Sequence, residues 1–367
     1  MSHSLLLFPN LGAEEGEGWP RAAAHPRVRA AARLWLSAFG PEARAVGGSV
    51  TRAQLAGELT RDRDRAALEW CDSPAGLVPW LATDEAEACA RRHGVSLAAA
   101  APAVVRRVHD KAFALEVARA RGLLEPELAE ACFALAPEEL GAADTVRCRI
   151  EAAVARWPAS LSASFVLKPR FGTSGRGRLA GRGGHVDLES LRGNLPRLRE
   201  RGGCLVEPWL ERLADLSAQL WLPPRGDVRV LATFVQEVTP AGVPLGHRAQ
   251  VTQSGELASG SRWDAELRAA ALALGRAAAE QGYTGPCGLD AFTWRAADGS
   301  ERFRAVVELN ARFTAGTSAV ALLARARRVG LLEGAREVYL GIEPASLAGR
   351  RLEVFADDPE LGLWLSD

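Results

Sequence analysis

Hydrophobic and polar positions follow two different spacings along this chain. Short apolar runs bounded by turn residues predict buried strands, and alternating apolar and polar positions predict strands with one covered face. The expected strands are 5–8, 165–167, 204–210, 215–221, 285–294 and 305–313. Since only the turn around Asp298-Gly299 separates the last two, we expect them to be neighbours in one sheet.

Apolar positions three and four residues apart predict helices in other parts of the chain. The expected helices are 28–39, 85–93, 319–329 and 331–339, and a further helix begins at Lys111. Asp84 and Asp110 are expected to cap two of them, and Gly40 and Gly94 follow the ends of two. The mixture predicts an α/β (α+β) chain, and 367 residues predict two or three lobes.

The composition singles out two lysines. Lys111 and Lys168 are the only lysines among 45 basic side chains, and the arginine bias is typical of a GC-rich coding sequence. Arginine replaces lysine readily on a surface, but its planar fork needs a different geometry from a compact ammonium. We therefore expect these two lysines where a point charge is required, Lys111 at the anion-binding start of a helix.

A glycine-rich loop follows Lys168. Its candidate binding residues are Gly172, Thr173, Ser174 and Gly175, which offer backbone N–H groups and hydroxyls with little bulk. Such loops close over phosphate oxygens. The spacing matches neither the P-loop pattern nor the dinucleotide pattern GxGxxG. Taken alone, the segment is also compatible with an ordinary hairpin turn.

The strand at 204–210 ends in an acid, a proline and an aromatic residue. Because the strand is expected to stop at Pro208, its backbone groups would be free to hydrogen-bond an adenine edge, and a nearby acid would bind ribose hydroxyls. The candidates are Glu207, Pro208, Trp209 and Leu210 for the base and Asp215 for the ribose.

The last two strands carry a polar set. Alternation places Glu308, Asn310 and Arg312 on one face, with Asp290 opposite on the neighbouring strand. Two acids and an amide form a hard oxygen site for Mg²⁺, and the arginine adds a cation for phosphate. The alternative is a solvated sheet face with cross-strand ion pairs.

In this order, the motifs resemble the ATP-grasp superfamily over residues 100–325. The resemblance implies that Lys111 and Lys168 contact nucleotide phosphates and that the glycine loop is a lid over them. It implies that residues 206–210 receive adenine. Asp215 falls where the family usually has a ribose-binding glutamate; it is shorter than glutamate and lies slightly further from the hinge acid.

The resemblance also implies a metal site and a reaction. Asp290, Glu308 and Asn310 match the residues that hold two Mg²⁺ ions, and Arg312 resembles the arginine that contacts the transferred phosphoryl group or the substrate carboxylate. Family members often carry a further phosphate-binding lysine. Here the basic candidates are arginines such as Arg229 and Arg248.

The implied reaction is ATP-dependent and ADP-forming, and it joins a carboxylate to an amine through an acylphosphate. Lys168 and Arg312 are the expected catalytic residues, ATP and Mg²⁺ the expected cofactors, and small-molecule carboxylates and amines the expected partners. The alternatives are a kinase on the same fold and a nucleotide-binding module without catalysis. The complete acidic set argues against the module.

The resemblance implies lobes in a set order. A Rossmann-like pre-ATP-grasp unit is expected at 1–103, a small lobe at 104–208, a large lobe at 209–330 and a helical tail at 331–367. The tail is expected either to cover the large lobe or to meet a second subunit in a homodimer. The loop at 10–16 is a candidate substrate loop, with an ordinary polar loop as the alternative.

Charge, cysteine and histidine spacing and hydropathy argue against a nucleic-acid-binding protein, a Cys/His metal site and a membrane protein. Acidic and basic residues balance at 45 each, which provides no field to recruit nucleic acid. The six cysteines form no CxxC pair and the six histidines no metal-ligand spacing, so we interpret both sets, including His185 and His247, as structural. Free thiols are typical of the cytoplasm. No apolar stretch approaches the ~18 residues that would predict a membrane span, and the apolar run at 5–8 is too short for a signal peptide.

Overall fold

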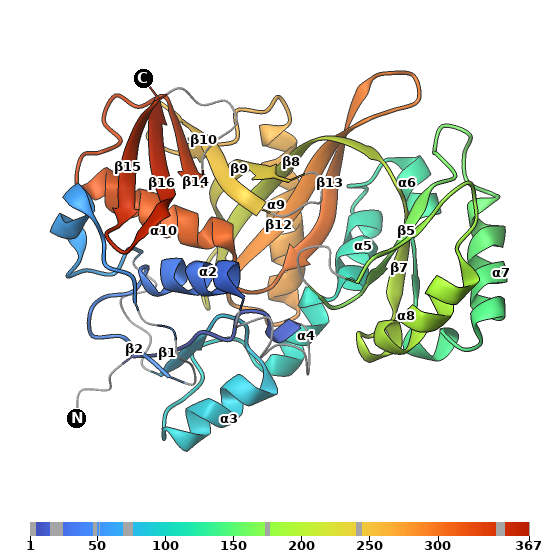
Figure 1. Ribbon diagram of the computed structural model, residues 1–367, viewed down its shortest axis with the longest axis horizontal. Helices are drawn as coiled ribbons and strands as arrows, with labels where there is room; N and C mark the ends of the chain where they lie inside the picture. The colour runs from blue at the N-terminus through green and yellow to red at the C-terminus, as the bar shows by residue number, and fades with distance from the viewer. Residues whose placement is uncertain are drawn as a thin grey trace.

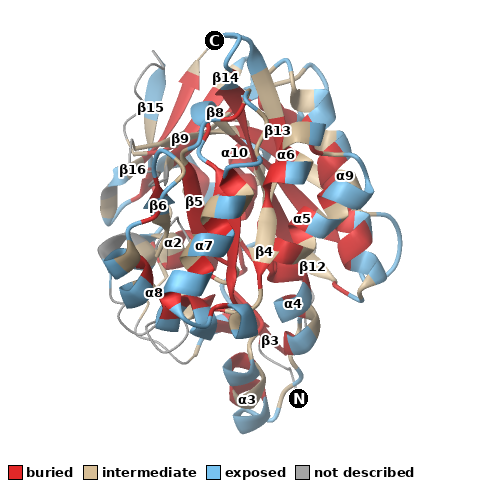
Figure 2. Cartoon of the chain, turned by 90° about the vertical axis from the view of Figure 1, so that its right-hand side faces the viewer, coloured by how far each residue is buried: buried red, intermediate tan, exposed pale blue. Residues whose placement is uncertain are grey.

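The computed structural model describes residues 5–14, 25–46, 50, 52–68, 76–172, 177–239, 244–342 and 349–366. Within these ranges the chain forms three β-sheets with helices packed against them (Figure 1). The buried residues follow the strands and the inner faces of the helices, and the outer helix faces are exposed (Figure 2). No helix in the described ranges has both the length and the apolar character that a membrane span requires.

The first sheet is parallel and lies near the N-terminus. Its order is β2-β1-β3, from β1 (Leu6–Phe8), β2 (Arg44–Ala45) and β3 (Leu77–Pro79). Helices α2 (Pro26–Leu36) and α3 (Asp84–Arg92) belong to the same part of the chain. The predicted strand and both predicted helices are confirmed. The predicted cap of α3 is wrong: Asp84 is the first helical residue, and the Thr83 hydroxyl accepts from the Ala86 amide at 3.2 Å.

The second sheet is antiparallel, with the order β4-β7-β5-β6. Its strands are β4 (Phe133–Leu135), β5 (Phe165–Pro169), β6 (Leu179–Gly181) and β7 (Cys204–Pro208). Helices α7 (Ala143–Val154) and α8 (Leu188–Glu200) lie side by side against it in Figure 1 and share one apolar core with it. The strands predicted around Lys168 and Glu207 are both present.

The third sheet is the largest, with the order β13-β12-β8-β9-β10-β14-β16-β15 and β11 paired to β10. Every pairing in it is antiparallel. Its first strands are β8 (Glu211–Leu222), β9 (Arg229–Val238), β10 (Pro244–Val251), β11 (Leu257–Ala258), β12 (Gly285–Arg295) and β13 (Glu301–Asn310). The predicted neighbours at 285–294 and 305–313 are therefore confirmed as a pair.

Helices cover both faces of this sheet. Gln219 on β8 accepts from Thr314 at the start of α10 (Ala315–Arg328), whereas the adjacent Leu220 lies near Gly275 of α9 (Asp264–Glu280). Because successive strand residues point to opposite faces, α10 and α9 lie on opposite sides. Helices α4 (Pro102–His109), α5 (Lys111–Ala120) and α6 (Pro126–Ala131) connect the parallel sheet to the four-stranded one. Among the described residues, 3₁₀ turns occur at Gly57–Asp62 and at Pro137–Glu139.

The helical tail expected at 331–367 is wrong. The chain there forms β14 (Glu337–Gly341), β15 (Arg350–Phe355) and β16 (Asp358–Ser366), which extend the large sheet. Gly330 and Gly334 both adopt positive φ and turn the chain where a helix was expected. Val338, Tyr339 and Leu340 are then buried in succession, as in a strand covered on both faces. The C-terminal strands also contact the N-terminal part of the chain. Ala56 donates its amide hydrogen to the Val354 carbonyl, and Leu55 forms a β-bridge with Phe355.

Candidate functional site

The three residues predicted to hold Mg²⁺ are Asp290, Glu308 and Asn310, here called the acidic set. They lie where β12 and β13 pair. Asp290 is directly opposite Glu308, and Gly288 is opposite Asn310. The Asn310 Nδ2 group donates to Asp290 Oδ2 at 3.1 Å and lies 3.5 Å from Glu308 Oε1. The sequence-based placement of these three side chains on one face is therefore correct. The group contains two carboxylates and one amide, and the described residues contain no cluster of three or more His, Cys, Asp and Glu side chains suited to a metal ion.

The electrostatics of this pair suit a bound cation. Burial and the charge of Glu308 raise the pKa of Asp290. Burial also acts to raise the pKa of Glu308, but the Lys111 ammonium outweighs it and holds that pKa low. Two partly buried carboxylates this close favour a divalent ion that binds both, and Mg²⁺ prefers such oxygen ligands. Asp290, Glu308 and Asn310 therefore fit the ion that the sequence predicted.

Lys111 joins the acidic set to the glycine loop. Asp110 caps α5 as predicted, since its carboxylate accepts from the Ala112 amide at 2.8 Å. The buried Lys111 side chain then places Nζ 3.0 Å from Glu308 Oε2, and it donates to the Gly172 carbonyl at 3.0 Å. One ammonium thus contacts both β13 and the first residue of the glycine loop.

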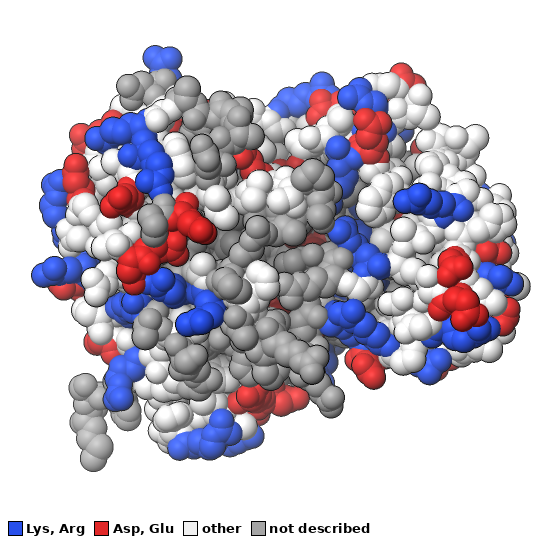
Figure 3. Space-filling view, viewed as in Figure 1, with Lys and Arg blue, Asp and Glu red and all other residues white. Residues whose placement is uncertain are grey.

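The loop itself is only partly described. Gly172 has φ +145°, and a Cβ there would lie 2.9 Å from the Arg201 guanidinium, so the position requires glycine. Thr173, Ser174 and Gly175 lie outside the described residues. Figure 3 shows basic side chains gathered along the boundary between the part of the molecule that holds the four-stranded sheet and the rest. A polyanion would be attracted to this boundary.

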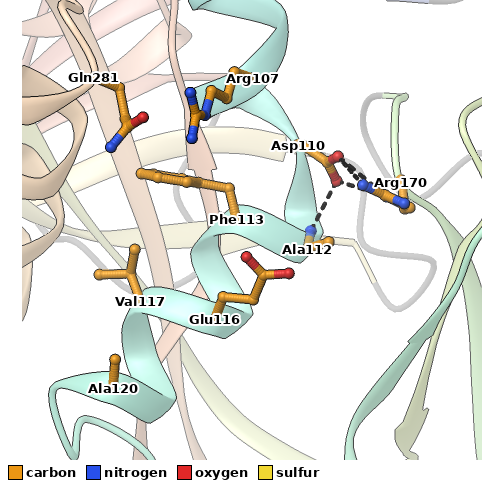
Figure 4. Close-up of a pocket in the computed structure, with 9 residues that line it drawn as sticks. All are labelled: Arg107, Asp110, Ala112, Phe113, Glu116, Val117, Ala120, Arg170 and Gln281. Carbon is orange, nitrogen blue, oxygen red and sulfur yellow. Dashed lines mark hydrogen bonds and ion pairs between the residues drawn. The ribbon is translucent and has the colours of Figure 1, made fainter.

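The ion pair between Asp110 and Arg170 connects the start of α5 to the end of β5. Arg170 Nε lies 2.9 and 3.1 Å from the two oxygens of Asp110. Dashed lines mark these contacts in Figure 4. The Lys111 amide also donates to the Arg170 carbonyl at 3.4 Å. The surface beside this ion pair is hollowed into a cavity of about 400 Å³, lined by Phe113 and Glu116 among others. None of the predicted site residues lines it, so we assign it no role.

Lys168 is held in a buried charge triad. Its Nζ lies 2.5 Å from Glu207 Oε2, and Arg304 Nη2 donates to Glu207 Oε1 at 2.6 Å. Burial acts to raise the pKa of Glu207, but Arg304 and Lys168 outweigh it and hold the value at about 2. The Glu207 side chain is therefore the counter-ion of the lysine. Sequence reasoning missed Arg304, because only the fold brings β13 against β7.

The predicted adenine segment is partly different from expectation. Strand β7 ends at Pro208, but the Trp209 amide donates to Ser164 at 2.8 Å and is not free for a base. This happens because the chain before β5 runs beside the end of β7. The Trp209 side chain is half exposed, and Arg178 lies 6.0 Å from its ring. Leu210 is buried with Phe292 and Trp294 in a separate apolar cluster.

The predicted ribose residue lies in mid-strand. Asp215 does not open β8, which begins at Glu211; it forms an ion pair with Arg212, whose guanidinium lies 4.6 Å from the Phe292 ring. Gln236 on β9, opposite Asp215, donates to Asp290 Oδ1 at 3.1 Å. Sequence reasoning missed Gln236 and Arg212, since no local motif reveals the register between β8, β9 and β12.

The two arginines suggested in place of a further lysine lie on β9 and β10. Arg229 is exposed at the start of β9, and Arg248 forms an ion pair with Glu237. Arg212, in contrast, interacts electrostatically with Asp290 of the acidic set. Burial lowers its pKa, and the charge of Asp290 acts in the opposite direction, as a neighbouring carboxylate does.

Arg312 links the acidic set to the N-terminal part of the chain. Its Nη2 donates to Asn310 Oδ1 at 3.2 Å, and its Nη1 donates to the Phe313 carbonyl at 2.8 Å. Its Nε forms an ion pair with Glu14, a buried residue of the predicted loop 10–16. Next to it, His109 Nδ1 accepts from the Ala311 amide at 3.1 Å, which places the proton of the neutral ring on Nε2. Burial lowers the pKa of His109 to about 3, so this ring is neutral.

Solved structures resemble the chain over nearly its whole length. The biotin carboxylase domain of Hydrogenobacter thermophilus 2-oxoglutarate carboxylase, crystallised with MgADP, ADP and bicarbonate, matches 99% of this chain and 86% of its own at 14% identity and TM-score 0.50. Campylobacter jejuni biotin carboxylase matches 99% of this chain and 87% of its own at 11% identity and TM-score 0.52. Rhizobium etli pyruvate carboxylase matches 99% of this chain and 35% of its own at 16% identity and TM-score 0.50. No protein-family model and no curated protein matches the sequence.

Proposed function

The chain has the ATP-grasp fold, as its sequence predicted, and on that premise we propose that it is an ATP-dependent, ADP-forming ligase joining a carboxylate to an amine. One observation carries the proposal. Lys111 contacts the acidic strand and the glycine loop at once, 3.0 Å from Glu308 and 3.0 Å from the Gly172 carbonyl. A phosphate chain between the loop and the strand would meet this ammonium and the acidic set together.

Each residue then has a task in binding ATP. Lys111 and Lys168 would bind phosphate oxygens, and Glu207 keeps its neutralising partner Arg304 when Lys168 turns to the nucleotide. Asp290, Glu308 and Asn310 would hold Mg²⁺, which supplies neutralisation of phosphate charge when bound. The segment 206–210 and Asp215 remain our proposal for the base and ribose, with Arg212 competing for Asp215.

The reaction follows from positioning. A carboxylate oxygen attacks the γ-phosphorus and ADP leaves; the amine then attacks the carbonyl carbon of the acylphosphate and inorganic phosphate leaves. Arg312 would hold the carboxylate in line, and Lys168 would stabilise charge that develops on the transferred phosphoryl group. Neither step needs a covalent bond to the protein.

We assign the lobes by the sheets that surround these residues. Residues 104–208, with the four-stranded sheet, would form the small lobe. The chain from 209 onward, whose large sheet includes β14 to β16 as well as the metal strands, would form the large lobe. The parallel sheet within 1–103 would be the pre-ATP-grasp unit. ATP would then lie between the four-stranded and the large sheet.

The test is ADP release with Mg²⁺-ATP against amino acids and dipeptides, singly and in pairs. Release that depends on one pair would identify both substrates. Hydroxylamine in place of the amine traps an acylphosphate as a hydroxamate, so phosphate transfer without hydroxamate would reveal a kinase. ATP binding without turnover of any compound would count against a ligase for these substrates.

A further inference from the structure

A second cavity lies beside Arg312. Its volume is about 370 Å³, and it lies between the segment that follows β3 and the start of β12. Trp80 and Ala98 line it from the N-terminal part of the chain, and Tyr283 and Phe313 line it from the part that holds the metal strands. The cavity therefore lies at the end of the strands that carry the acidic set.

The walls of this cavity are apolar and aromatic. The Trp80 and Phe313 rings stack with centroids 6.2 Å apart and planes inclined by 28°, and Phe39 packs edge-on against Phe313. The Tyr283 hydroxyl donates to the Pro286 carbonyl at 2.5 Å, which satisfies its polar end within the wall. A ligand group that enters here meets aromatic carbon on several sides.

One charged side chain stands among the described lining residues, and it is Arg312. Its guanidinium lies 5.8 Å from the Trp80 ring centroid and donates to Asn310 of the acidic set. Its Nε is paired with Glu14, whereas each terminal nitrogen makes one hydrogen bond, to Phe313 or to Asn310, and carries a second N–H. That pair of N–H groups matches the two oxygens of a carboxylate.

We propose that this cavity receives the apolar, preferably aromatic, group of the carboxylate substrate while Arg312 binds its carboxylate. The inference rests on the proposed ligase function and specifies its substrate class. An apolar cavity of about 150 Å³ already admits benzene, so the observed volume accommodates a phenyl ring with a short linker. A second carboxylate in the cavity would lack a cation, because Arg312 is the one charged side chain among the described lining residues.

The test compares carboxylates that differ only in this group. The full chain is assayed for ADP release and hydroxamate with Mg²⁺-ATP, hydroxylamine and either 3-phenylpropanoate, acetate or glutarate. We expect kcat/KM for 3-phenylpropanoate to exceed that for each of the others by about 100-fold, the effect of burying a large apolar group.

Phenylalanine substitutions at two alanines distinguish blocking of the cavity from a general loss of activity. Ala98 is half-buried in the cavity wall, and Ala98→Phe fills the space; Ala101 is exposed, three residues on, and lies outside the lining. Ala98→Phe should remove the preference for 3-phenylpropanoate, and Ala101→Phe should leave it unchanged. A thermal shift on adding Mg²⁺-ADP verifies that both variants are folded.

The outcomes distinguish this inference from the proposed function. If acetate yields hydroxamate as well as 3-phenylpropanoate does, or if Ala98→Phe keeps the preference, the cavity is not the substrate site and the ligase stands. If no carboxylate yields hydroxamate although Mg²⁺-ADP binds, the ligase proposal fails for these acids. Calorimetric titration of 3-phenylpropanoate into the Mg²⁺-ADP-bound chain then decides the cavity: binding that Ala98→Phe abolishes supports it, and no binding to the unmodified chain overturns it.

Discussion

Glu207 is the common counter-ion of a buried arginine and a partly buried lysine. Its side chain is 1% exposed, and both of its oxygens face positive charge, from Lys168 and Arg304. Removing one member of a buried ion pair leaves an uncompensated charge, which is far more costly than losing an exposed pair. The sequence predicted both Lys168 and Glu207 as nucleotide-binding residues, but it gave no indication that they are each other's partner.

Glu207→Gln should therefore destabilise the chain by about 3–5 kcal/mol, because Lys168 and Arg304 lose their common counter-ion. Urea unfolding measures the change. The matched control is Glu211→Gln, whose partner Arg295 is exposed and whose loss should cost at most about 1 kcal/mol. Equal effects from the two substitutions would mean that the triad is not a buried unit.

Glu308→Gln should lower ADP release by about 100-fold or more while the chain stays folded, since the acidic set loses one charge and Lys111 loses its ion pair. Lys168→Ala should likewise abolish ATP turnover. Glu301→Gln, on the same strand but half-exposed and paired with Arg262, is the control and should keep full turnover. Unchanged turnover in Glu308→Gln would remove this residue from the mechanism.

At the scale of elements, the capped start of α5 determines where Lys111 points. Asp110 accepts from the Ala112 amide and also binds Arg170 at the end of β5. One carboxylate thus serves both as a helix cap and as a link between two elements. A local signal, an acid before an apolar run, was enough to predict the cap, but the Arg170 contact spans 60 residues and leaves no local trace.

Asp110→Ala should cost about 2 kcal/mol of stability, because both the cap and the ion pair are lost. Asp110→Asn keeps a capping oxygen and should cost less. Thr83→Ala, at the cap of α3, is the reference and should cost about 1 kcal/mol. Urea midpoints of the three variants test this; a loss in Asp110→Ala no larger than in Thr83→Ala would show that the Arg170 contact contributes nothing.

What the sequence predicted correctly at this scale was local or strongly patterned. The strands around Lys168 and the pairing of Asp290 with Glu308 followed from apolar runs, alternation and a nearby turn. The C-terminal strands were missed, because helical spacing and a buried strand are hard to separate in a short apolar run. Gln236 and Arg304 were missed for another reason, since their contacts depend on the order of distant strands.

At the scale of the whole molecule, two histidines are kept neutral by burial. Burial lowers the pKa of His247 to about 4 and that of His109 to about 3. The unfolded chain takes up these protons near pH 6.5, before the folded chain does, so the unfolded state binds more protons as the pH falls. Stability is therefore expected to decrease below pH 6.5, down to the folded pKa values.

His247→Gln tests this pH dependence. Between pH 7 and pH 4.5 this variant should lose about 2 kcal/mol less stability than the unmodified chain. The reason is that it lacks the histidine whose pKa is lower in the folded than in the unfolded state. Urea unfolding at the two pH values gives the difference. His93→Gln, at an exposed histidine, should leave the difference unchanged. A pH dependence in His247→Gln identical to that of the unmodified chain would contradict the assignment.

The order of strands in the large sheet has a consequence for biosynthesis. Strand β16 lies between β14 and β15 and consists of the last described residues, and β15 contacts the 3₁₀ turn near the N-terminus. During translation the N-terminal part emerges first. Until residues 358–366 leave the ribosome, β14 is an open sheet edge, and such edges template aggregation. The large sheet is therefore completed only by residues 358–366, and a chain interrupted before them would expose the edge of β14.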